Sequence, residues 1–404
     1  MEKRKGNMNR EDSASLHLST RTVHAGEERI KFAKSLINPI AQTATYIFES
    51  LEEFEAFKAG EGESYEYGRY GNPTQRTAEK KIAALEGAEE GLLLSSGMSA
   101  VTTTLLAMLR SGQHLVVLGD VYRMTVKFGK IIEKFGIQTT QVDAWDWEEL
   151  ERAVRPETRI LFTESPTNPH LRVIDLERLV AFAQKHRLKV VIDSTFATPI
   201  NQRPLEFGVD LVIHSATKYL GGHNDLVAGG VFGAREMVDA IREFQRVTGS
   251  LVDPMTSFLL IRGLKTLALR IKRQNETALE MARFLNGHPA IKKVYYPGLD
   301  DHPDHQVAER LMEGYGGVVS FDIDGDLNRT RRFVQMLKIP YLAPSLGGVE
   351  SLATHPATMS FYDLNREERI AIGINDELVR YAVGIEEGDD LIADLEEALK
   401  GIKD

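Results

Sequence analysis

Short apolar runs alternate with longer helical patterns between residues 72 and 263, and this alternation limits the fold more than any other feature of the sequence. The apolar runs, which predict strands, lie at residues 91–94, 114–118, 159–163, 188–193 and 209–213. The helical patterns lie at residues 77–86, 98–110, 128–135 and 176–186. Strands joined by helices pair in parallel, because each helix returns the chain across a face of the sheet. We therefore predict an α/β fold with a mostly parallel central sheet and helices on both faces.

The chain divides into three predicted parts. Residues 1–71 form an N-terminal arm and inter-subunit segment, and its first 20 residues are polar and loosely attached. Residues 72–265 form the α/β domain. Residues 266–404 form a smaller α+β domain, and a long helical pattern at residues 255–285 leads into it.

A lysine stands just beyond one of the predicted strands. The strand at 209–213 is followed by Ser215, Thr217 and Lys218. A lysine at the mouth of a buried strand is partly desolvated, which lowers its pKa and makes the amine nucleophilic. The two hydroxyls can donate hydrogen bonds to an anion such as a phosphate. Taken alone, a lysine after a strand is more often a solvated surface charge.

An aspartate ends an earlier apolar run. Asp193 closes the strand at 188–193, and alone it would be interpreted as a helix N-cap. Open α/β sheets bind ligands at the carboxyl ends of their strands, so Asp193 and Lys218 are expected in one site. A Schiff-base lysine, an aspartate for a pyridinium nitrogen and phosphate donors are the groups that hold pyridoxal phosphate.

The turn that leads into the helical pattern at 98–110 is a second candidate for phosphate binding. Gly97 lets the backbone approach a ligand closely, and the first amides of a helix face an anion. We expect the amides of Gly97 and Met98 to bind the cofactor phosphate together with Ser215 and Thr217. The alternative is an ordinary serine-capped helix.

Two further residues follow predicted strands. Tyr122 comes shortly after the strand at 114–118 and can stack on a flat aromatic cofactor. Asn168 lies between two prolines in a rigid loop and can donate to the ring 3-oxygen. The alternatives are a half-buried tyrosine and a simple turn.

Two arginines are candidates for binding anions. Arg69 lies in a segment rich in tyrosine and glycine, and arginine recognises phosphate through two hydrogen bonds. Its place before the α/β region suggests an arm that reaches a neighbouring subunit, and the alternative is a surface loop. Arg380 lies in the apolar run at 378–384, where a buried arginine needs a partner. That partner is either an amino-acid carboxylate or a structural salt bridge.

Composition excludes several classes of protein. The net charge is −10 and no basic block suggests nucleic-acid binding. No apolar run approaches the ~18 residues of a membrane span, and the basic residues 3–5 do not begin a signal or transit peptide. We therefore expect a cytoplasmic protein. The absence of cysteine excludes disulfides and thiolate metal sites. His302 and His305 are expected in a surface loop without a metal.

Taken together, these residues resemble the Cys/Met-metabolism family of pyridoxal-phosphate enzymes, which have fold type I. The motifs that carry the resemblance are YGRYGNPT at 67–74, SGM at 96–98, ESPTNP at 164–169, SATKY at 215–219 and SLGGVESL at 345–352. Within the family the likeness is greatest to the cystathionine γ-synthase branch, especially its plant type. The stretches that support this branch are HND at 223–225, YYPGL at 295–299, GGVVSF at 316–321 and IPYLAPS at 339–345.

The resemblance implies a role for each residue at the predicted cofactor site. It implies that Lys218 forms the imine with pyridoxal phosphate and carries protons, and that Asp193 pairs with the pyridinium nitrogen. It also implies that Tyr122 stacks on the ring and acts with Lys218 in catalysis. Asn168 would contact the ring 3-oxygen.

The resemblance further implies shared active sites. Tyr67 and Arg69 would bind the phosphate of the neighbouring subunit's cofactor, while Arg380 and Ser345 would hold the substrate carboxylate. The implied assembly is a homo-oligomer, a tetramer built as a dimer of dimers. Its substrates would be small amino acids, with no nucleic acid and no membrane as partners.

The implied reaction is a γ-replacement that joins an activated homoserine to L-cysteine and yields L-cystathionine. Met124 stands where plant-type enzymes tend to carry a lysine, so O-acetyl-, O-succinyl- and O-phosphohomoserine all remain open. The alternatives are a sulfhydrylase that uses sulfide, a γ-lyase acting on cystathionine or methionine, and a non-catalytic protein with this fold.

Overall fold

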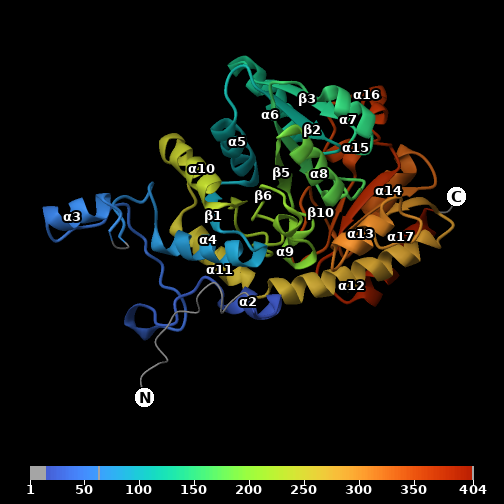
Figure 1. The fold of residues 1–404 in the computed structure, drawn as a ribbon. Helices are drawn as coiled ribbons and strands as arrows, with labels where there is room; N and C mark the ends of the chain where they lie inside the picture. The colour runs from blue at the N-terminus through green and yellow to red at the C-terminus, as the bar shows by residue number, and fades with distance from the viewer. Residues whose placement is uncertain (1–14, 62–63, 403–404) are drawn as a thin grey trace.

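Two sheets organise the computed structural model, which describes residues 15–61 and 64–402 (Figure 1). The larger sheet has seven strands in the order β1-β7-β6-β5-β4-β2-β3, and the smaller has five in the order β10-β11-β12-β9-β8. The strands of the larger sheet are β1 (Glu90–Leu94), β2 (His114–Leu118), β3 (Gln138–Val142), β4 (Thr158–Glu164), β5 (Lys189–Asp193), β6 (Leu211–His214) and β7 (Gly229–Gly233).

Most neighbouring strands of the larger sheet are parallel, which confirms the predicted class. The pairs β2–β3, β2–β4, β4–β5 and β5–β6 are parallel. Strand β7 is antiparallel to both β6 and β1. Strand β7 was not predicted from the sequence, because three of its five residues are glycines. Gly229 is required there, since a Cβ at this position would lie 2.1 Å from the carbonyl oxygen of Ser96.

Helices cover both faces of the larger sheet, because successive strand residues point to opposite sides. Leu115 and Val117 of β2 pack in the cluster that contains α5 and α10, whereas Val116 and Leu118 pack toward α7 and α8. The helices of this part are α4 (Pro73–Glu86), α5 (Gly97–Met108), α6 (Arg123–Ile132), α7 (Trp147–Ala153), α8 (Leu176–His186), α9 (Thr198–Asn201) and α10 (Arg235–Thr248), with 3-10 turns η2 (Glu133–Phe135) and η3 (Pro204–Phe207).

The C-terminal part contains the smaller sheet. Its strands are β8 (Ile291–Tyr295), β9 (Val318–Ile323), β10 (Tyr341–Leu342), β11 (Leu352–Thr354) and β12 (Leu378–Ala382). The helices here and leading into it are α11 (Pro254–Leu264), α12 (Leu267–Asn286), α13 (His305–Leu311), α14 (Leu327–Met336), α15 (Pro356–Met359), α16 (Arg366–Ala371) and α17 (Gly388–Gly401). The domain boundaries after residues 71 and 265 stay a prediction.

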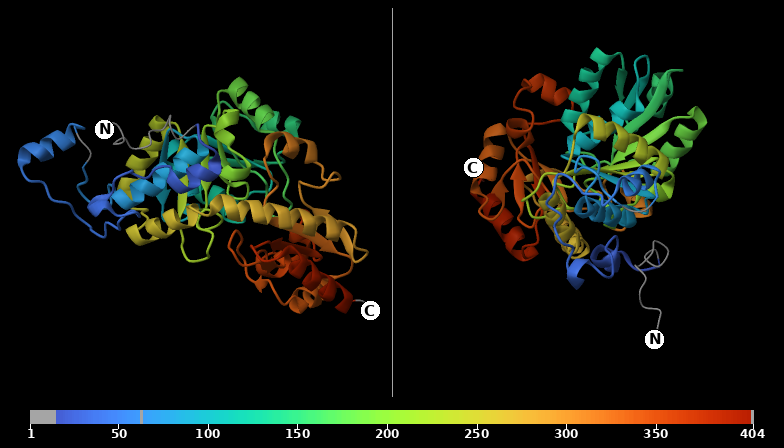
Figure 2. Two further views of the ribbon diagram at one scale, coloured as in Figure 1. Left: turned by 90° about the horizontal axis from the view of Figure 1, so that it is seen from below. Right: turned by 90° about the vertical axis from the view of Figure 1, so that its left-hand side faces the viewer.

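The long helical pattern expected at residues 255–285 forms two helices, α11 and α12, with a short break between them. The break comes at residues 265–266. At Gly263, near the end of α11, a Cβ would lie 2.2 Å from the carbonyl oxygen of Gly221. The end of α11 therefore packs tightly against the turn that follows Lys218. Helix α12 then runs along the lower side of the molecule to the C-terminal part (Figure 2).

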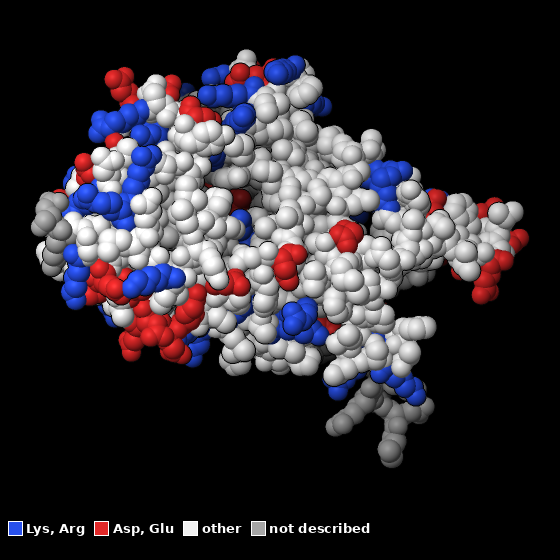
Figure 3. Space-filling model, turned by 180° about the vertical axis from the view of Figure 1, so that it is seen from behind, with Lys and Arg blue, Asp and Glu red and all other residues white. Residues whose placement is uncertain are grey.

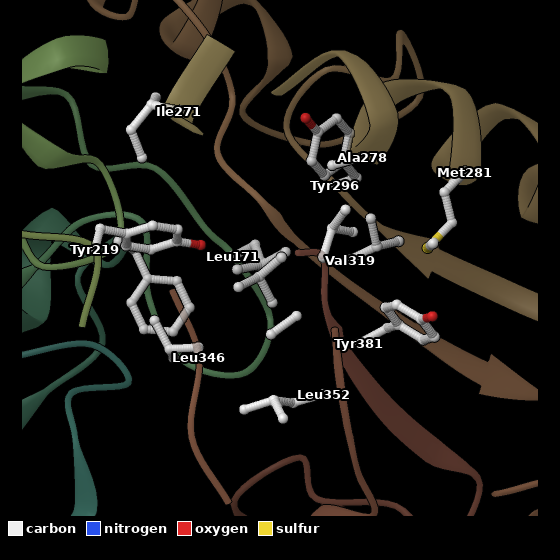
Figure 4. Packing of buried hydrophobic residues seen from close by; sticks show 14 of the residues in the cluster. Leu171, Tyr219, Ile271, Ala278, Met281, Tyr296, Val319, Leu346, Leu352 and Tyr381 are labelled. Atoms are coloured by element: carbon white, nitrogen blue, oxygen red, sulfur yellow. The ribbon is translucent and has the colours of Figure 1, made fainter. Parts of the chain in front are cut away.

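One continuous buried cluster joins the two sheets. It contains Tyr219 and Phe232 from the larger sheet and its turns, together with Val319 and Tyr381 from the smaller sheet. Figure 4 shows Tyr219 at one side of this cluster and Tyr381 at the other, with aliphatic side chains between them. The turn that carries Lys218 is thus anchored in the shared core.

The N-terminal arm extends away from the larger sheet, and α3 (Leu51–Lys58) lies at its tip (Figures 1 and 2). The arm also contains α2 (Leu18–His24) and the 3-10 turn η1 (Phe32–Lys34). The basic residues 3–5 lie outside the described residues. Residues 18–20, which were expected to be loosely attached, belong to α2, and Lys81 binds that helix by donating to the carbonyl oxygen of Thr22 at 3.1 Å. In the described ranges, no helix has both the length and the apolar character to cross a membrane.

Candidate active site

The carboxyl ends of three parallel strands meet at one edge of the larger sheet. Strands β4, β5 and β6 end at Glu164, Asp193 and His214, and the loops that follow them start from this edge. Because these strands are parallel neighbours, the polar residues beyond them lie close together. Seen from behind, the molecule has a hollow with acidic atoms at its bottom and basic atoms beside them (Figure 3).

Lys218 lies directly against the C-terminal part of the chain. Its Nζ donates to Ser345 Oγ at 2.7 Å. Burial and the nearby charge of Arg380 lower the pKa of Lys218 to about 8. The contact requires a glycine at position 347, where φ is +80° and a Cβ would lie 2.6 Å from the amide nitrogen of Tyr219. The structure therefore brings together Lys218, Ser345 and Arg380, three of the predicted site residues.

Asp193 is fixed by its own loop. Its Oδ1 accepts hydrogen bonds from the amide of Thr195 at 3.0 Å and from the Thr195 hydroxyl at 2.5 Å. The same hydroxyl accepts from the amide of Ser215 at 2.8 Å, which links the ends of β5 and β6. Burial raises the pKa of Asp193, although the bonds from Thr195 oppose it. Among the residues that the structure describes, the carboxylate is thus held in place by hydrogen bonds from Thr195 and not by a cation.

The N-terminus of α5 approaches the Lys218 loop closely. A Cβ on Gly97 would lie 2.7 Å from Cβ of Ser215, so only glycine allows this approach. Two of the predicted phosphate-binding residues are therefore neighbours. The hydroxyl of Thr217 donates to the carbonyl oxygen of Ala228 at 3.1 Å and accepts from the Ala228 amide at 3.0 Å. Met98 lies near α6, where its Sδ accepts from Thr125 Oγ1 at 3.8 Å.

Arg380 is buried in the middle of β12 and faces the same site. Its Nη1 donates to Asn168 Oδ1 at 3.1 Å and its Nη2 donates to the carbonyl oxygen of Ser345 at 3.0 Å. Burial lowers the pKa of Arg380 to about 10. Among the described residues, no group accepts a hydrogen bond from its buried Nε. The guanidinium therefore has capacity left for an anionic ligand.

Tyr122 precedes α6 and its side chain is 44% exposed. Its backbone amide donates to Glu164 Oε2 at 2.8 Å. Glu164 is 3% exposed, and neither it nor Thr195 was assigned a role from the sequence. The position that identified Asp193 could also have identified these two residues, because Glu164 ends a parallel strand and Thr195 lies just after one.

Tyr67 and Arg69 lie away from Lys218. Arg69 donates through Nη1 to the carbonyl oxygen of Arg246 in α10, and its guanidinium lies 4.7 Å from the centre of the Tyr70 ring. A hollow of about 1010 Å³ beside it is lined by basic and acidic side chains, but not by Lys218. Within one chain, the structure does not bring these two residues to the predicted cofactor site.

The loop that contains His302 and His305 differs from the surface loop that was expected. His302 is 6% exposed and Asp304 is 5% exposed. The loop is drawn inward because Asp304 accepts from Arg172 Nε at 2.6 Å and from the amide of Val173 at 3.0 Å. Within the described ranges, no cluster of three or more His, Asp or Glu side chains could hold a metal ion.

Comparisons with known proteins match nearly the whole chain. A family model described as Cys/Met metabolism PLP-dependent enzyme matches residues 19–400. The chain is 49% identical over 385 residues to cystathionine gamma-synthase 1, chloroplastic, of Arabidopsis thaliana, which covers 94% of this chain and 68% of that protein. It is 42% identical over 389 residues to an L-methionine gamma-lyase of Fusobacterium nucleatum, covering 95% of this chain and 98% of that protein. The crystal structure of metB from Corynebacterium glutamicum superposes with a TM-score of 0.91 at 36% identity, covering 97% of this chain and all of that chain (100%).

Proposed function

The chain belongs to the Cys/Met metabolism family of PLP-dependent enzymes, and we propose that within it the protein is a cystathionine γ-synthase. The proposed reaction joins an activated homoserine to L-cysteine. The bond between Cγ and its oxygen breaks, and the ester group leaves with that oxygen. A bond forms between Cγ and the cysteine sulfur, the thiol proton is released, and L-cystathionine results.

The residues of the site fit pyridoxal phosphate, the cofactor of the family. Asp193 is a half-buried carboxylate with a raised pKa, and a cationic ring nitrogen beside it would supply the missing charge. The amides at the start of α5 approach Ser215 so closely that a Cβ at Gly97 would collide with it. Such a cradle suits a phosphate. When bound, the cofactor supplies an electron sink for the negative charge that develops at the substrate carbons.

Lys218 is proposed to attach the cofactor and to move protons at the substrate α-carbon. Its lowered pKa, about 8, leaves a substantial fraction of the amine neutral near physiological pH, so it can accept a proton. Ser345 Oγ, at 2.7 Å, keeps the amine on the side of the site that faces the C-terminal part. Tyr122 is proposed to lie against the ring and Asn168 to donate to its 3-oxygen.

Arg380 is proposed to hold the α-carboxylate of the substrate. Its Nε is buried without an acceptor among the described residues, while Asn168 and Ser345 already orient its other two nitrogens. A carboxylate at Nε would complete the hydrogen bonding of the guanidinium and fix the substrate relative to Lys218.

The observation that carries the choice of a synthase is the extensive identity with the Arabidopsis synthase. The test is an assay of the purified holoenzyme with O-acetyl-, O-succinyl- and O-phosphohomoserine, each with L-cysteine. Cystathionine from at least one ester is the expected result. No cystathionine from any of the three would refute the proposal.

A γ-lyase is the second candidate, because the chain is also similar to an L-methionine gamma-lyase. Both reactions need the same cofactor site, so the site geometry does not separate them. The discriminating measurement is release of 2-oxobutanoate from cystathionine or methionine without added thiol. A release rate above the rate of cystathionine synthesis would assign the protein as a lyase.

The active unit is proposed to be at least a dimer with shared sites, assembled further into a tetramer. The support is the position of Arg69, which lies beside α10 and away from Lys218 of its own chain, with Tyr67 stacked next to it. The arm that precedes them also presents apolar side chains to solvent, among them Phe32 at 83% and Ile47 at 91% exposure. Such exposure is typical of an interface. The cytoplasmic location stays a prediction.

A further inference from the structure

Two carboxylates lie side by side at the edge of the sheet that carries the site. Glu164 ends β4 and Asp193 ends β5, and the two residues are direct partners in the parallel register. Residues two positions earlier, Phe162 and Val191, belong to the same buried cluster, so Glu164 and Asp193 project from the same face. Glu164 is therefore a neighbour of the proposed pyridinium partner, although no step of the proposed reaction uses it.

Glu164 also holds the residue proposed to lie against the ring. Its Oε2 accepts from the backbone amide of Tyr122 at 2.8 Å. Tyr122 stands immediately before α6, and within the described part of the chain no side chain caps that end of the helix. The hydrogen bond to Glu164 thus determines where the Tyr122 backbone, and with it the ring, is placed relative to β4 and β5.

Three charged groups act on the buried Glu164 carboxyl. Burial raises its pKa well above the usual range, and the charges of Asp193 and Asp120 add to this effect. The hydrogen bond from Tyr122 and the charge of Arg380 oppose it. Glu164 is buried and Asp193 is half-buried, and two neighbouring carboxylates in such a place do not both ionise readily, so one of them keeps its proton. Asp193 has two hydrogen bonds from Thr195 that favour its charged form, whereas Glu164 has one donor.

We propose that Glu164 is a positioning residue for the cofactor ring. Glu164 is a neutral acid that holds the Tyr122 backbone, and the negative charge stays on Asp193. The inference depends on the cofactor of the family but not on the substrate, so it holds for a synthase and a lyase alike. Its failure and the failure of the proposed function are therefore distinguishable.

The variants Glu164→Gln and Glu164→Leu separate the two parts of this proposal. Glutamine keeps a neutral acceptor for the Tyr122 amide, whereas leucine leaves that amide without a partner. Pyridoxal phosphate is titrated into each apoprotein without substrate, and the dissociation constant and the visible circular dichroism of the bound cofactor are measured. Glu157→Gln is the matched control, because Glu157 is an exposed glutamate just before the same strand.

We expect Glu164→Gln and the control to bind the cofactor within about twofold of the parent with the same dichroism. Glu164→Leu should bind about tenfold more weakly, the cost of one buried unpaired donor, and lose dichroic intensity. Equal weakening in the glutamine and leucine variants would show that the charge of Glu164 is required and would overturn the proposal. Parent-like binding by the leucine variant would show that Glu164 positions nothing.

A second measurement needs neither the cofactor nor a folded leucine variant. If Glu164 keeps its proton in the folded apoprotein, the unfolded chain releases that proton first as pH rises above about 4.5. Rising pH therefore favours the unfolded state more and more, and the parent loses stability relative to Glu164→Gln between about pH 5 and pH 7. The expected result is that the urea midpoint of the parent falls relative to that of Glu164→Gln as pH rises over this range. Parallel curves would overturn the neutral state of Glu164.

Discussion

Replacing Glu90 by glutamine is expected to destabilise the fold substantially, because this carboxylate holds three arginines at the edge of the larger sheet. It accepts from Arg76 Nη2 at 2.8 Å, from Arg235 Nη1 at 2.6 Å and from Arg242 Nη2 at 3.3 Å. Its side chain is 4% exposed. The interactions join α4, β1 and α10, so the loss of the charge affects three elements together.

The pKa of Glu90 gives the size of the effect. Burial alone would raise it, but hydrogen bonds from Arg76 and the amide of Gly91 and the nearby arginine charges lower it from 4.5 to about 2. At about 1.4 kcal/mol for each tenfold change in proton affinity, this difference corresponds to about 3 kcal/mol. Removing one partner of a buried ion pair costs a similar amount, roughly 3–5 kcal/mol.

The pH dependence follows from the lowered pKa. The stabilisation is fully present above the unfolded pKa of about 4.5 and is lost as pH falls toward about 2. Urea unfolding of the apoprotein at one protein concentration measures the effect, since association and cofactor binding shift apparent stability. The control is Glu148→Gln. Glu148 is paired with Arg152 at 3.8 Å and its side chain is 91% exposed. We expect its replacement to change the free energy of unfolding by less than about 0.5 kcal/mol. A Glu90→Gln loss below about 1 kcal/mol at pH 7, or a loss independent of pH, would refute the reasoning.

Three further predictions concern the site. Lys218→Ala should keep the fold but lose the visible absorbance of the bound cofactor, and its turnover should fall at least about a thousandfold. Turnover within tenfold of the parent would contradict the proton-transfer role. Arg380→Lys should raise KM for the amino-acid substrate about tenfold, because lysine cannot donate as a planar fork, and steady-state kinetics with an unchanged KM would contradict the carboxylate assignment. Mixing inactive Arg69→Ala and Lys218→Ala subunits should restore activity, to at most about half per hybrid dimer under two-fold symmetry. Hybrids that form and remain inactive would contradict the shared site.

The sequence was sufficient to predict those parts of the site that lie at strand ends. Asp193 and Lys218 follow apolar β-branched runs, whose burial and parallel pairing can be predicted from the residues alone, and both lie at the same edge of the sheet. Ser345 could be placed beside Lys218 only through the family resemblance. Its contact with Lys218 depends on a loop of the C-terminal part that lies 127 residues further along the chain.

Other features could not be predicted because they depend on tertiary packing. The glycine at position 263, near the end of α11, is required by the close approach of Gly221, and nothing in the local sequence identifies that partner. Strand β3 was missed because it is an edge strand with four polar residues among five, so it lacks an apolar run. The role of Glu164 depends on which strands are neighbours, since its effect comes from Asp193 across the β4–β5 pair.

The pairing of β1 with β7 has a consequence for how the chain is made. Strand β1 ends at Leu94, yet the strand beside it starts only at Gly229. At roughly 5–20 residues per second, the ribosome needs on the order of ten seconds to synthesise the chain between them. During this time the apolar residues of β1 have no strand beside them, and α4 and α5 are the neighbours already synthesised that can cover them. The growing chain therefore carries an open apolar edge for about a third of its synthesis. We expect this edge to be where chaperones bind and where premature termination leads to aggregation.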